Sequence, residues 1–295
     1  MGALHARVVA TNSRTELAWI CDVNKSAAQV VADRFGCRAI LVPEMDVDGI
    51  IVAVSTQFHY GIGLDILKSG IPLLMEKPLT DNIAHTRELI VAAKNQSVPL
   101  ICGFLERFNP AVRTALEIVK NPIYFKSIRH SPMTPRIQTG VAGDLLIHDV
   151  DLALRLFGEM PLRIFGMKDC AENGIEDVAE GLMRFSKDRI ASVSASRRSQ
   201  RKVRSISIAE PNRLIEVDLL RQDVTIYQNV GESISDAEIG YKQLTTIDIP
   251  ALRFQGEPLM MQLEFFADVI QEKVDGSTEL ESMLQSHEVI EKIIT

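Results

Sequence analysis

The chain has 295 residues and a formal net charge of -7, with 46% hydrophobic and 24% charged residues. This length suits two domains of ordinary size better than one small core. The absence of an apolar run near twenty residues and of a basic-then-apolar leader disfavours a membrane protein or an exported one. The acidic charge disfavours nucleic acid as a partner, so we expect a cytoplasmic protein with a small-molecule ligand.

The first hundred residues alternate short β-rich runs with amphipathic stretches. We expect helices at residues 2–10, 27–35, 57–69 and 81–95, with Asn24 or Ser26 capping the second helix, Gly36 ending it and Thr80 capping the fourth. The expected strands are residues 17–22, 38–40, 49–54, 72–75 and 98–102. This alternation builds a parallel sheet through right-handed crossovers.

The beginning of this pattern departs from a complete dinucleotide fold. A doubly wound sheet has the strand order 3-2-1-4-5-6, which would place one more strand before the helix at residues 2–10, in the middle of the sheet. Gly2 matches only the last glycine of a G-x-G-x-x-G fingerprint. We therefore expect a Rossmann-type domain that lacks its first strand, and a truncated or misassigned start. Gly2 would let the backbone approach a pyrophosphate at the helix N-terminus, or it is a chance glycine.

Asp22 follows Gly2 by twenty positions, at the end of a predicted strand. An acidic side chain there accepts hydrogen bonds from the ribose hydroxyls of NAD and repels the 2'-phosphate of NADP. The alternative is that Asp22 opens a turn over residues 22–24. The first interpretation predicts NAD, with NADP disfavoured.

A lysine stands in Glu76-Lys77-Pro78, directly after a predicted strand. Proline disfavours helical geometry at Lys77, and ligands bind at the carboxyl ends of strands in such sheets. A partly desolvated lysine there is suited to polarising a substrate oxygen. The alternative is an exposed lysine paired with Glu76.

Asp144 and His148 lie at helical spacing within residues 143–157, so the carboxylate is placed to orient the imidazole. Such a histidine is suited to removing a hydroxyl proton while hydride leaves the same carbon. The alternatives are a capping Asp144, a buried structural His148, or metal ligation together with Asp149 and Asp151. We expect no metal, because no second histidine or cysteine lies nearby at ligand spacing.

After residue 106 the composition changes from alternating elements to clustered strands. We divide the chain into a dinucleotide-binding domain, residues 1–106, and a substrate-binding and oligomerisation domain, residues 107–295. The strands expected in the second domain are residues 124–130, 162–166, 180–185, 190–195, 203–209, 214–219 and 223–228. They predict an α+β domain with a mixed, largely antiparallel sheet. Helices would cover one face of this sheet and leave the other face for a second subunit.

Two sets of basic residues remain. Arg129 and Arg136 flank a proline-containing loop, where guanidinium groups would grip a diphosphate bidentately or serve as surface charges. A second cluster is interpreted as a solvated turn without function. Its members are Arg197, Arg198, Arg201, Lys202 and Arg204.

The order of the motifs resembles the glucose-fructose oxidoreductase, inositol dehydrogenase and rhizopine-catabolism (Gfo/Idh/MocA) family over essentially the whole chain. The matching stretches are Cys21-Asp22-Val23, Ser55-Thr56 followed by His59, Glu76-Lys77-Pro78-Leu79, Arg107-Phe108-Asn109-Pro110 and Gly143-Asp144 to Asp151. The stretch from Gly103 to Val112, together with two later segments, resembles the branch that oxidises the 3-hydroxyl of UDP-N-acetylglucosamine.

The resemblance implies roles for individual residues. It implies dimers or tetramers and makes Lys77, Asp144 and His148 the catalytic residues. The residues implied to contact the nicotinamide cofactor are Asp22, Ser55, Thr56, His59, Glu76 and Lys77.

Two hypotheses of different classes follow. The preferred one is an NAD-dependent dehydrogenase acting on a ring hydroxyl of a sugar, cyclitol or nucleotide sugar. The other is a non-catalytic protein of the same fold that senses a sugar or cofactor. The presence of Lys77, Asp144 and His148 favours the enzyme, whereas the incomplete fingerprint favours the sensor.

Overall fold

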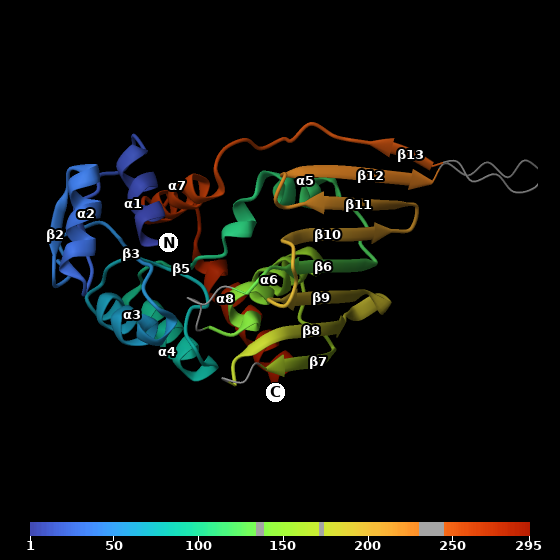
Figure 1. Cartoon of the computed structure of the whole chain (residues 1–295), viewed down its shortest axis with the longest axis horizontal. Helices are drawn as coiled ribbons and strands as arrows, with labels where there is room; N and C mark the ends of the chain where they lie inside the picture. Colours follow the sequence, from blue (N-terminus) through green and yellow to red (C-terminus); the bar gives the residue numbers. More distant parts are fainter. Residues whose placement is uncertain (134–138, 171–173, 230–244) are drawn as a thin grey trace, which may run out of the picture. The chain divides into compact units, whose positions relative to one another are not determined.

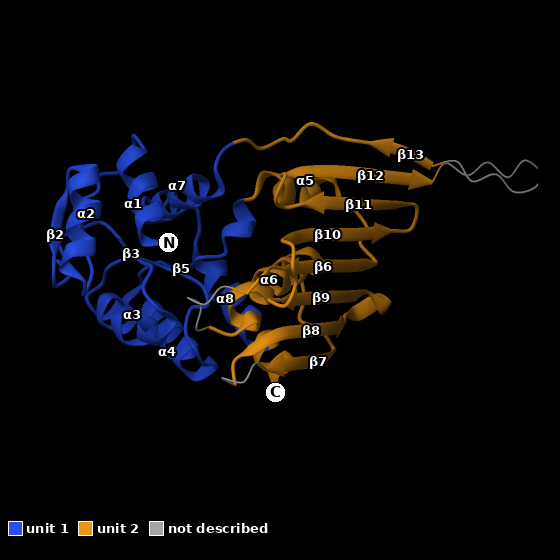
Figure 2. Cartoon of the chain, viewed as in Figure 1, with its two compact units in different colours: residues 1–108, 256–288 blue, residues 109–255, 289–295 orange. Residues whose placement is uncertain are grey.

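The computed structural model describes residues 1–133, 139–170, 174–229 and 245–295 (Figure 1). They form two compact units (Figure 2): unit 1 comprises residues 1–108 and 256–288, and unit 2 comprises residues 109–255 and 289–295. This division differs from the predicted one because residues 256–288 return to unit 1. No described helix is both long and apolar enough to cross a membrane.

Unit 1 alternates strands and helices, as the sequence predicts. Its strands are β1 (Trp19–Cys21), β2 (Arg38–Ile40), β3 (Ile50–Val52), β4 (Leu73–Met75) and β5 (Leu100–Cys102). Its helices are α1 (Gly2–Thr11), α2 (Lys25–Phe35), α3 (His59–Lys68), α4 (Ile83–Gln96) and α7 (Pro258–Ile270), with 3-10 turns η1 (Thr56–Phe58) and η2 (Leu105–Phe108). Helix α8 (Ser277–Ile294) begins in this unit.

All five predicted strands of the first domain are confirmed, and they form two parallel sheets. One sheet pairs β1 with β2, and the other has the order β3-β4-β5. Helix α2 also agrees with the prediction, since the Asn24 side chain accepts from the N–H of Ala27 and Gly36 ends the helix at a φ of 71°. A positive φ costs glycine little, which explains the helix stop.

The core of unit 1 joins residues that are far apart in sequence. Leu259 and Leu263 of α7 pack against Val8 of α1. One turn further along α7, Phe266 packs against Leu74 of β4. A helix from the end of the chain therefore completes the core of the first unit.

Unit 2 is built around one eight-stranded sheet with the order β13-β12-β11-β10-β6-β9-β8-β7. The strands are β6 (Tyr124–His130), β7 (Arg163–Cys170), β8 (Glu176–Arg184), β9 (Ile190–Ser196), β10 (Val203–Glu210), β11 (Arg213–Asp218), β12 (Asp223–Asn229) and β13 (Thr245–Asp248). Within the described strands of this sheet only the β6–β9 pair is parallel, so the predicted mixed, largely antiparallel sheet is confirmed. Strand β13, a short strand of exposed residues, was not predicted from the sequence.

The helices of unit 2 contact this sheet. Helix α5 (Pro110–Ile118) contacts β11 and β12, and α6 (Ile147–Phe157), preceded by the π-helical turn η3 (Ala142–Leu146), contacts β9. Inward and outward residues alternate along β9, as expected for a strand with one covered face. At the β7 edge, Phe165 and Met167 are 62% and 78% exposed.

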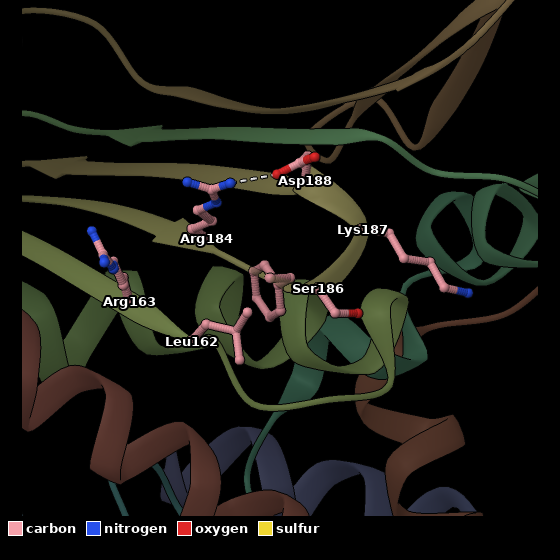
Figure 3. Close-up of a pocket in the computed structure, with 7 residues that line it drawn as sticks. Leu162, Arg163, Arg184, Ser186, Lys187 and Asp188 are labelled. Carbon is pink, nitrogen blue, oxygen red and sulfur yellow. Dashed lines mark hydrogen bonds and ion pairs between the residues drawn. The ribbon is translucent and has the colours of Figure 1, made fainter.

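Two surface hollows lie in unit 2. The first, about 360 Å³ in volume, opens at the β8–β9 turn, where Arg184 binds Asp188 (Figure 3). The second, about 600 Å³, lies at the β10–β11 turn. Neither is lined by a residue that the sequence analysis singled out as catalytic or cofactor-binding. The predicted site residues lie instead at strand ends and near the beginnings of helices.

Candidate active site

The carboxyl ends of β3, β4 and β5 lie at one edge of their sheet. Val52, Met75 and Cys102 are aligned in register across the three strands. Beyond them, the N–H of Glu76 donates to the carbonyl of Val52 at 2.9 Å, and that of Gly103 donates to Met75 at 2.7 Å. The residues that follow these strands thus share the edge at which ligands bind in parallel sheets.

A buried histidine from α1 fixes the carboxylate before the lysine. Nε2 of His5 is 2.8 Å from Oε1 of Glu76, and the two residues are 4% and 7% exposed. The second oxygen, Oε2, accepts from the N–H of Lys77 at 3.3 Å. A Cβ atom at Gly103 would lie 3.0 Å from Cα of Glu76, so glycine lets the neighbouring backbone pass closely. Glu76 is thus fixed by His5, by the N–H of Lys77 and by the close backbone of Gly103. The position of Lys77, which follows it, is fixed as well.

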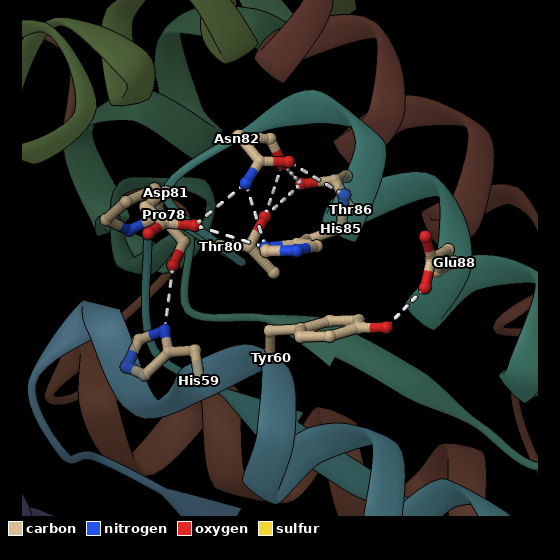
Figure 4. Close-up of polar contacts among 9 residues, drawn as sticks. All are labelled: His59, Tyr60, Pro78, Thr80, Asp81, Asn82, His85, Thr86 and Glu88. Atoms are coloured by element: carbon tan, nitrogen blue, oxygen red, sulfur yellow. Dashed lines mark hydrogen bonds and ion pairs between the residues drawn. The ribbon is translucent and has the colours of Figure 1, made fainter.

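Two more buried histidines bind the backbone of the same turn. Nδ1 of His59 is 2.9 Å from the carbonyl oxygen of Pro78 (Figure 4). Its Nε2 is 3.1 Å from the carbonyl oxygen of Val54. Nε2 of His287 accepts from the N–H of Leu79 at 2.9 Å. His59 is 1% exposed, and both ring nitrogens face backbone carbonyls, which argues against its predicted contact with a cofactor.

The helix that follows this turn begins later than predicted. The side chain of Asn82, not that of Thr80, caps α4 by accepting from the N–H of His85 at 2.9 Å. The Thr80 hydroxyl instead donates to the carbonyl of Asn82 at 2.6 Å and lies 2.7 Å from the Thr86 hydroxyl (Figure 4). The predicted cap at Thr80 is wrong, because its hydroxyl bonds the carbonyl of Asn82 in the loop and not an N–H of the first helical turn.

The remaining predicted cofactor residues of unit 1 lie at accessible positions. One carboxylate oxygen of the exposed Asp22 accepts from the N–H of Asn24 at 2.8 Å, which is the turn role considered as an alternative. No heavy atom beyond the chain neighbours of Gly2 and the α1 backbone lies within 4 Å of where its Cβ would be, so a side chain there would meet no other part of the described structure. Ser55 is exposed, and Thr56 is half-buried at the start of η1. An open helix N-terminus and an exposed carboxylate fit a dinucleotide.

In unit 2, Asp144 and His148 lie on either side of a π-to-α junction. The N–H of Ile147 donates to the carbonyl of Ala142, five residues back, so the chain is π-helical over the turn that carries Asp144. His148 follows in the first turn of α6 and is 8% exposed. π-Helical turns inside helices are frequent at functional sites. The predicted helix is present, but it begins with a wider turn than the α spacing implies.

An arginine that the sequence analysis set aside binds Asp144. Nη2 of Arg197 donates to Oδ2 of Asp144 at 2.6 Å, and Nη1 donates to the carbonyl of Thr139 at 2.7 Å. Arg197 is 3% exposed, so its assignment to a solvated turn is wrong. Its neighbour Arg198 has a side chain that is 48% exposed and binds Asp169. Alternation along β9 was the available signal, because position 197 is in phase with the buried positions of that strand.

Arg129 is also engaged inside unit 2. Its Nη2 donates to Oδ1 of Asp149 at 2.6 Å, and the two side chains are 2% and 1% exposed. Because the Arg129 guanidinium is buried and paired with Asp149, the structure argues against its predicted binding of a diphosphate. The same pairing argues against Asp149 as a metal ligand. Arg136, the other predicted member, lies outside the described residues.

Two models of known protein families match the chain. A model described as "Oxidoreductase family, NAD-binding Rossmann fold" (Gfo/Idh/MocA) matches residues 1–104, and the Gfo/Idh/MocA C-terminal domain matches residues 122–210. UDP-N-acetylglucosamine 3-dehydrogenase of Acidithiobacillus ferrooxidans is 30% identical over 234 residues, covering 77% of this chain and 74% of that protein. The chain belongs to the Gfo/Idh/MocA oxidoreductase family.

Other similarities agree with this assignment. Inositol 2-dehydrogenase of Rhizobium meliloti is 24% identical over 219 residues, which are 68% of this chain and 66% of that protein. The solved structure of the Acidithiobacillus ferrooxidans UDP-N-acetylglucosamine 3-dehydrogenase aligns with a TM-score of 0.86 and 24% identity, over 99% of this chain and 93% of that one. This Gfo/Idh/MocA chain therefore has the Rossmann and C-terminal folds of its family.

Proposed function

We propose that this Gfo/Idh/MocA chain is an NAD-dependent dehydrogenase acting on a ring hydroxyl of a sugar, cyclitol or nucleotide sugar. The observation that carries the proposal is the turn over residues 76–80, which presents Lys77 at the ligand edge of the sheet. One buried histidine, His5, binds the Glu76 side chain of this turn, and two others, His59 and His287, bind its backbone. The histidine and carboxylate of unit 2 supply the matching acid–base pair. The similar sugar-nucleotide and inositol dehydrogenases support this substrate class.

The proposed reaction breaks the O–H and C–H bonds of a carbinol and forms a carbonyl. His148 takes the hydroxyl proton, Asp144 orients His148, and Lys77 polarises the oxygen as its electron density rises. The nicotinamide ring, when bound, supplies the hydride acceptor. In the opposite direction the same residues return the proton to the substrate oxygen.

The proposed cofactor contacts lie in unit 1. Gly2 admits the pyrophosphate to the head of α1, and Asp22, after β1, binds the ribose hydroxyls. Ser55 and Thr56 contribute from the carboxyl end of β3, in the other sheet. The carboxylate of Asp22 favours NAD over NADP. His59 and Glu76 support the turn that presents Lys77, through the hydrogen bonds described above.

The finer substrate proposal is a UDP-sugar oxidised at its 3-hydroxyl, which rests on the similarity to the Acidithiobacillus ferrooxidans enzyme. Arg136 remains a proposed ligand of the diphosphate. Arg129 is not carried forward, because Asp149 occupies its guanidinium.

Cofactor binding and turnover test the proposal. Titration with NADH and NADPH, followed by fluorescence, should show binding with NADH preferred. The protein should then reduce NAD with UDP-N-acetylglucosamine or an inositol as substrate. Lys77→Met and His148→Ala should each abolish turnover while thermal unfolding stays close to wild type, and His148→Ala should keep wild-type NADH binding. Binding of NADH without turnover of any of these substrates would favour the sensor hypothesis. Absence of NADH and NADPH binding would overturn the dehydrogenase, because no hydride acceptor would be bound.

We also propose that the chain acts in the cytoplasm as a homodimer or homotetramer, paired through the outer face of the unit 2 sheet. Phe165, Met167 and Leu182 expose apolar surface on β7 and β8. Phe165→Glu with Met167→Glu should halve the mass measured by light scattering, because the contact through this face is lost. Val30→Glu, at a 69% exposed position on α2, should not change it. A single-chain mass for the unmodified protein would contradict this proposal.

A further inference from the structure

We propose that Arg197 is a positioning residue for the dehydrogenase reaction, because it sets the orientation of Asp144 beside His148. The inference rests on the proposed roles of Asp144 and His148. It assigns to Arg197 no contact with the substrate or the cofactor.

The placement of Arg197 is fixed by its backbone. It directly follows β9, and its N–H donates to the carbonyl of Asp177 on β8 at 2.8 Å. The side chain, 3% exposed, then reaches Asp144 at 2.6 Å and the carbonyl of Thr139 at 2.7 Å. One guanidinium group thus joins the carboxylate to the backbone five residues before it. The planar guanidinium presents several N–H groups in a fixed fork, which a lysine ammonium does not reproduce.

The two side-chain hydrogen bonds of Arg197 span the start of the π-helical turn, where the regular α-helical hydrogen bonds are interrupted. Asp144 lies in the π-helical turn Ala142–Leu146, and its own N–H donates to the carbonyl of Gly140 at 3.0 Å. Such turns occur mostly as single interruptions of α-helices. Because Arg197 bonds both the entry of this turn and the carboxylate within it, the Asp144 side chain is directed by the sheet as well as by its own helix.

A second arginine provides an internal comparison. Arg129 of β6 pairs in register with Ala195 of β9, two positions before Arg197, so both arginines project from the same face of the sheet. Arg129 binds Asp149, directly after His148. The Asp149 side chain is 1% exposed, whereas that of Asp144 is 16% exposed. The Arg129 pair is therefore inside the core, and only the Arg197 pair ends in a carboxylate that solvent or a ligand can approach.

The charges around Asp144 come from several elements. Arg197 approaches from the end of β9, and His148 follows on α6. From β8, the Glu176 carboxyl group packs so closely on Gly140 that a Cβ atom there would overlap it. Asp177 of β8 lies 3.6 Å from Nε of Arg198. Loss of the Arg197 cation would make protonation of the Asp144 carboxylate easier, because its positive partner at 2.6 Å would be gone.

Steady-state kinetics of matched variants test the inference. Arg197→Met should lower kcat by about 100-fold, the scale of a small misplacement of a reacting group, with little change in KM or in NADH binding. The acid limb of its kcat/KM profile should move to higher pH. Arg197→Lys, which keeps the charge but not the fork, should retain the wild-type acid limb while kcat stays reduced. Arg198→Met, the neighbouring exposed arginine, should resemble wild type in both respects.

A double variant separates positioning from general damage. If Arg197 acts through Asp144, Asp144→Asn with Arg197→Met should be no slower than Asp144→Asn alone. Wild-type kcat in Arg197→Met, or losses that multiply in the double variant, would overturn the inference. If Arg197→Met fails to fold, wild-type kcat in Arg197→Lys overturns it equally. Full activity of Asp144→Asn would instead refute the proposed role of Asp144.

Discussion

His5 and Glu76, 71 residues apart in the chain, form a buried pair with 2.8 Å between Nε2 and Oε1. Their side chains are 6% and 9% exposed. The pair ties the first helix to the strand end that precedes Lys77, so the stability of unit 1 and the position of the proposed catalytic lysine depend on the same contact.

Glu76→Ala should therefore lower the free energy of unfolding by about 1–3 kcal/mol, because it leaves the buried ring of His5 without its carboxylate partner. Urea unfolding followed by circular dichroism measures the change. The control is Glu257→Ala, which breaks the pair with Arg7 in the same unit, where the side chains are 35% and 44% exposed. That control should cost less than about 1 kcal/mol. Equal losses of unfolding free energy in the two variants would show that burial does not strengthen the His5–Glu76 pair.

The buried pair of Arg129 and Asp149 predicts a strongly non-additive result. Arg129→Met should cost about 3–5 kcal/mol, since Asp149 is left as an uncompensated charge in the core. Adding Asp149→Leu should recover much of this loss, because the two apolar side chains fill the same space without charge. Urea midpoints of the single and double variants check this, and a double variant less stable than Arg129→Met would contradict it.

Glu210 predicts a pH dependence of stability. Burial raises the pKa of this carboxyl group, but hydrogen bonds from the N–H groups of Asn121 and Lys120 and from Arg213 outweigh burial, so the pKa lies below its ordinary value of 4.5. A lowered folded-state pKa means that the stabilisation is present above the unfolded pKa and is lost as pH falls through the folded one.

Glu210→Gln should accordingly lower the urea midpoint at neutral pH, and its difference from wild type should shrink at about pH 3. Glu216→Gln, on the next strand at an exposed position, should show little difference at either pH. A constant difference for Glu210→Gln over this range would show that its carboxylate is not the stabilising form.

Substitutions at two glycines distinguish an effect on NADH binding from an effect on stability. At Gly2 and at Gly61, no heavy atom beyond the chain neighbours and the backbone of the same helix lies within 4 Å of where a Cβ atom would be. Gly61→Ala, inside α3, should raise the free energy of unfolding by about 0.5–1 kcal/mol with unchanged NADH affinity. Gly2→Ala should leave stability intact but raise the Kd for NADH, because its methyl group would stand where the pyrophosphate approaches. Equal NADH affinities in both variants would sink the proposed role of Gly2.

The sequence was most informative where local patterns decide structure. The parallel strands of unit 1 and the antiparallel strands of unit 2 followed from periodicity, and Asn24 and Gly36 marked the ends of α2. It was least informative where contacts are distant. The pairing of His5 with Glu76 and the packing of Phe266 on β4 depend on residues that share no local pattern.

The candidate site shows the same division. The motifs marked Lys77, Asp144 and His148 without any coordinates, yet the partners of Asp144 were missed. Counting alternate positions along β9 would have placed Arg197 inward and Arg198 outward, but the density of basic residues suggested a solvated turn. Burial of a charge becomes predictable only when the opposite charge facing it is known, and Asp144 lies 53 residues earlier.

The return of residues 256–288 to the first unit has a consequence for biosynthesis. A ribosome exposes α1 and β4 long before it makes Leu263 and Phe266, which cover Val8 and Leu74. The nascent chain therefore carries an unfinished apolar surface while nearly all of the large sheet is being translated. Chaperones that recognise apolar surfaces would therefore have time to bind unit 1 until residues 256–288 emerge from the ribosome.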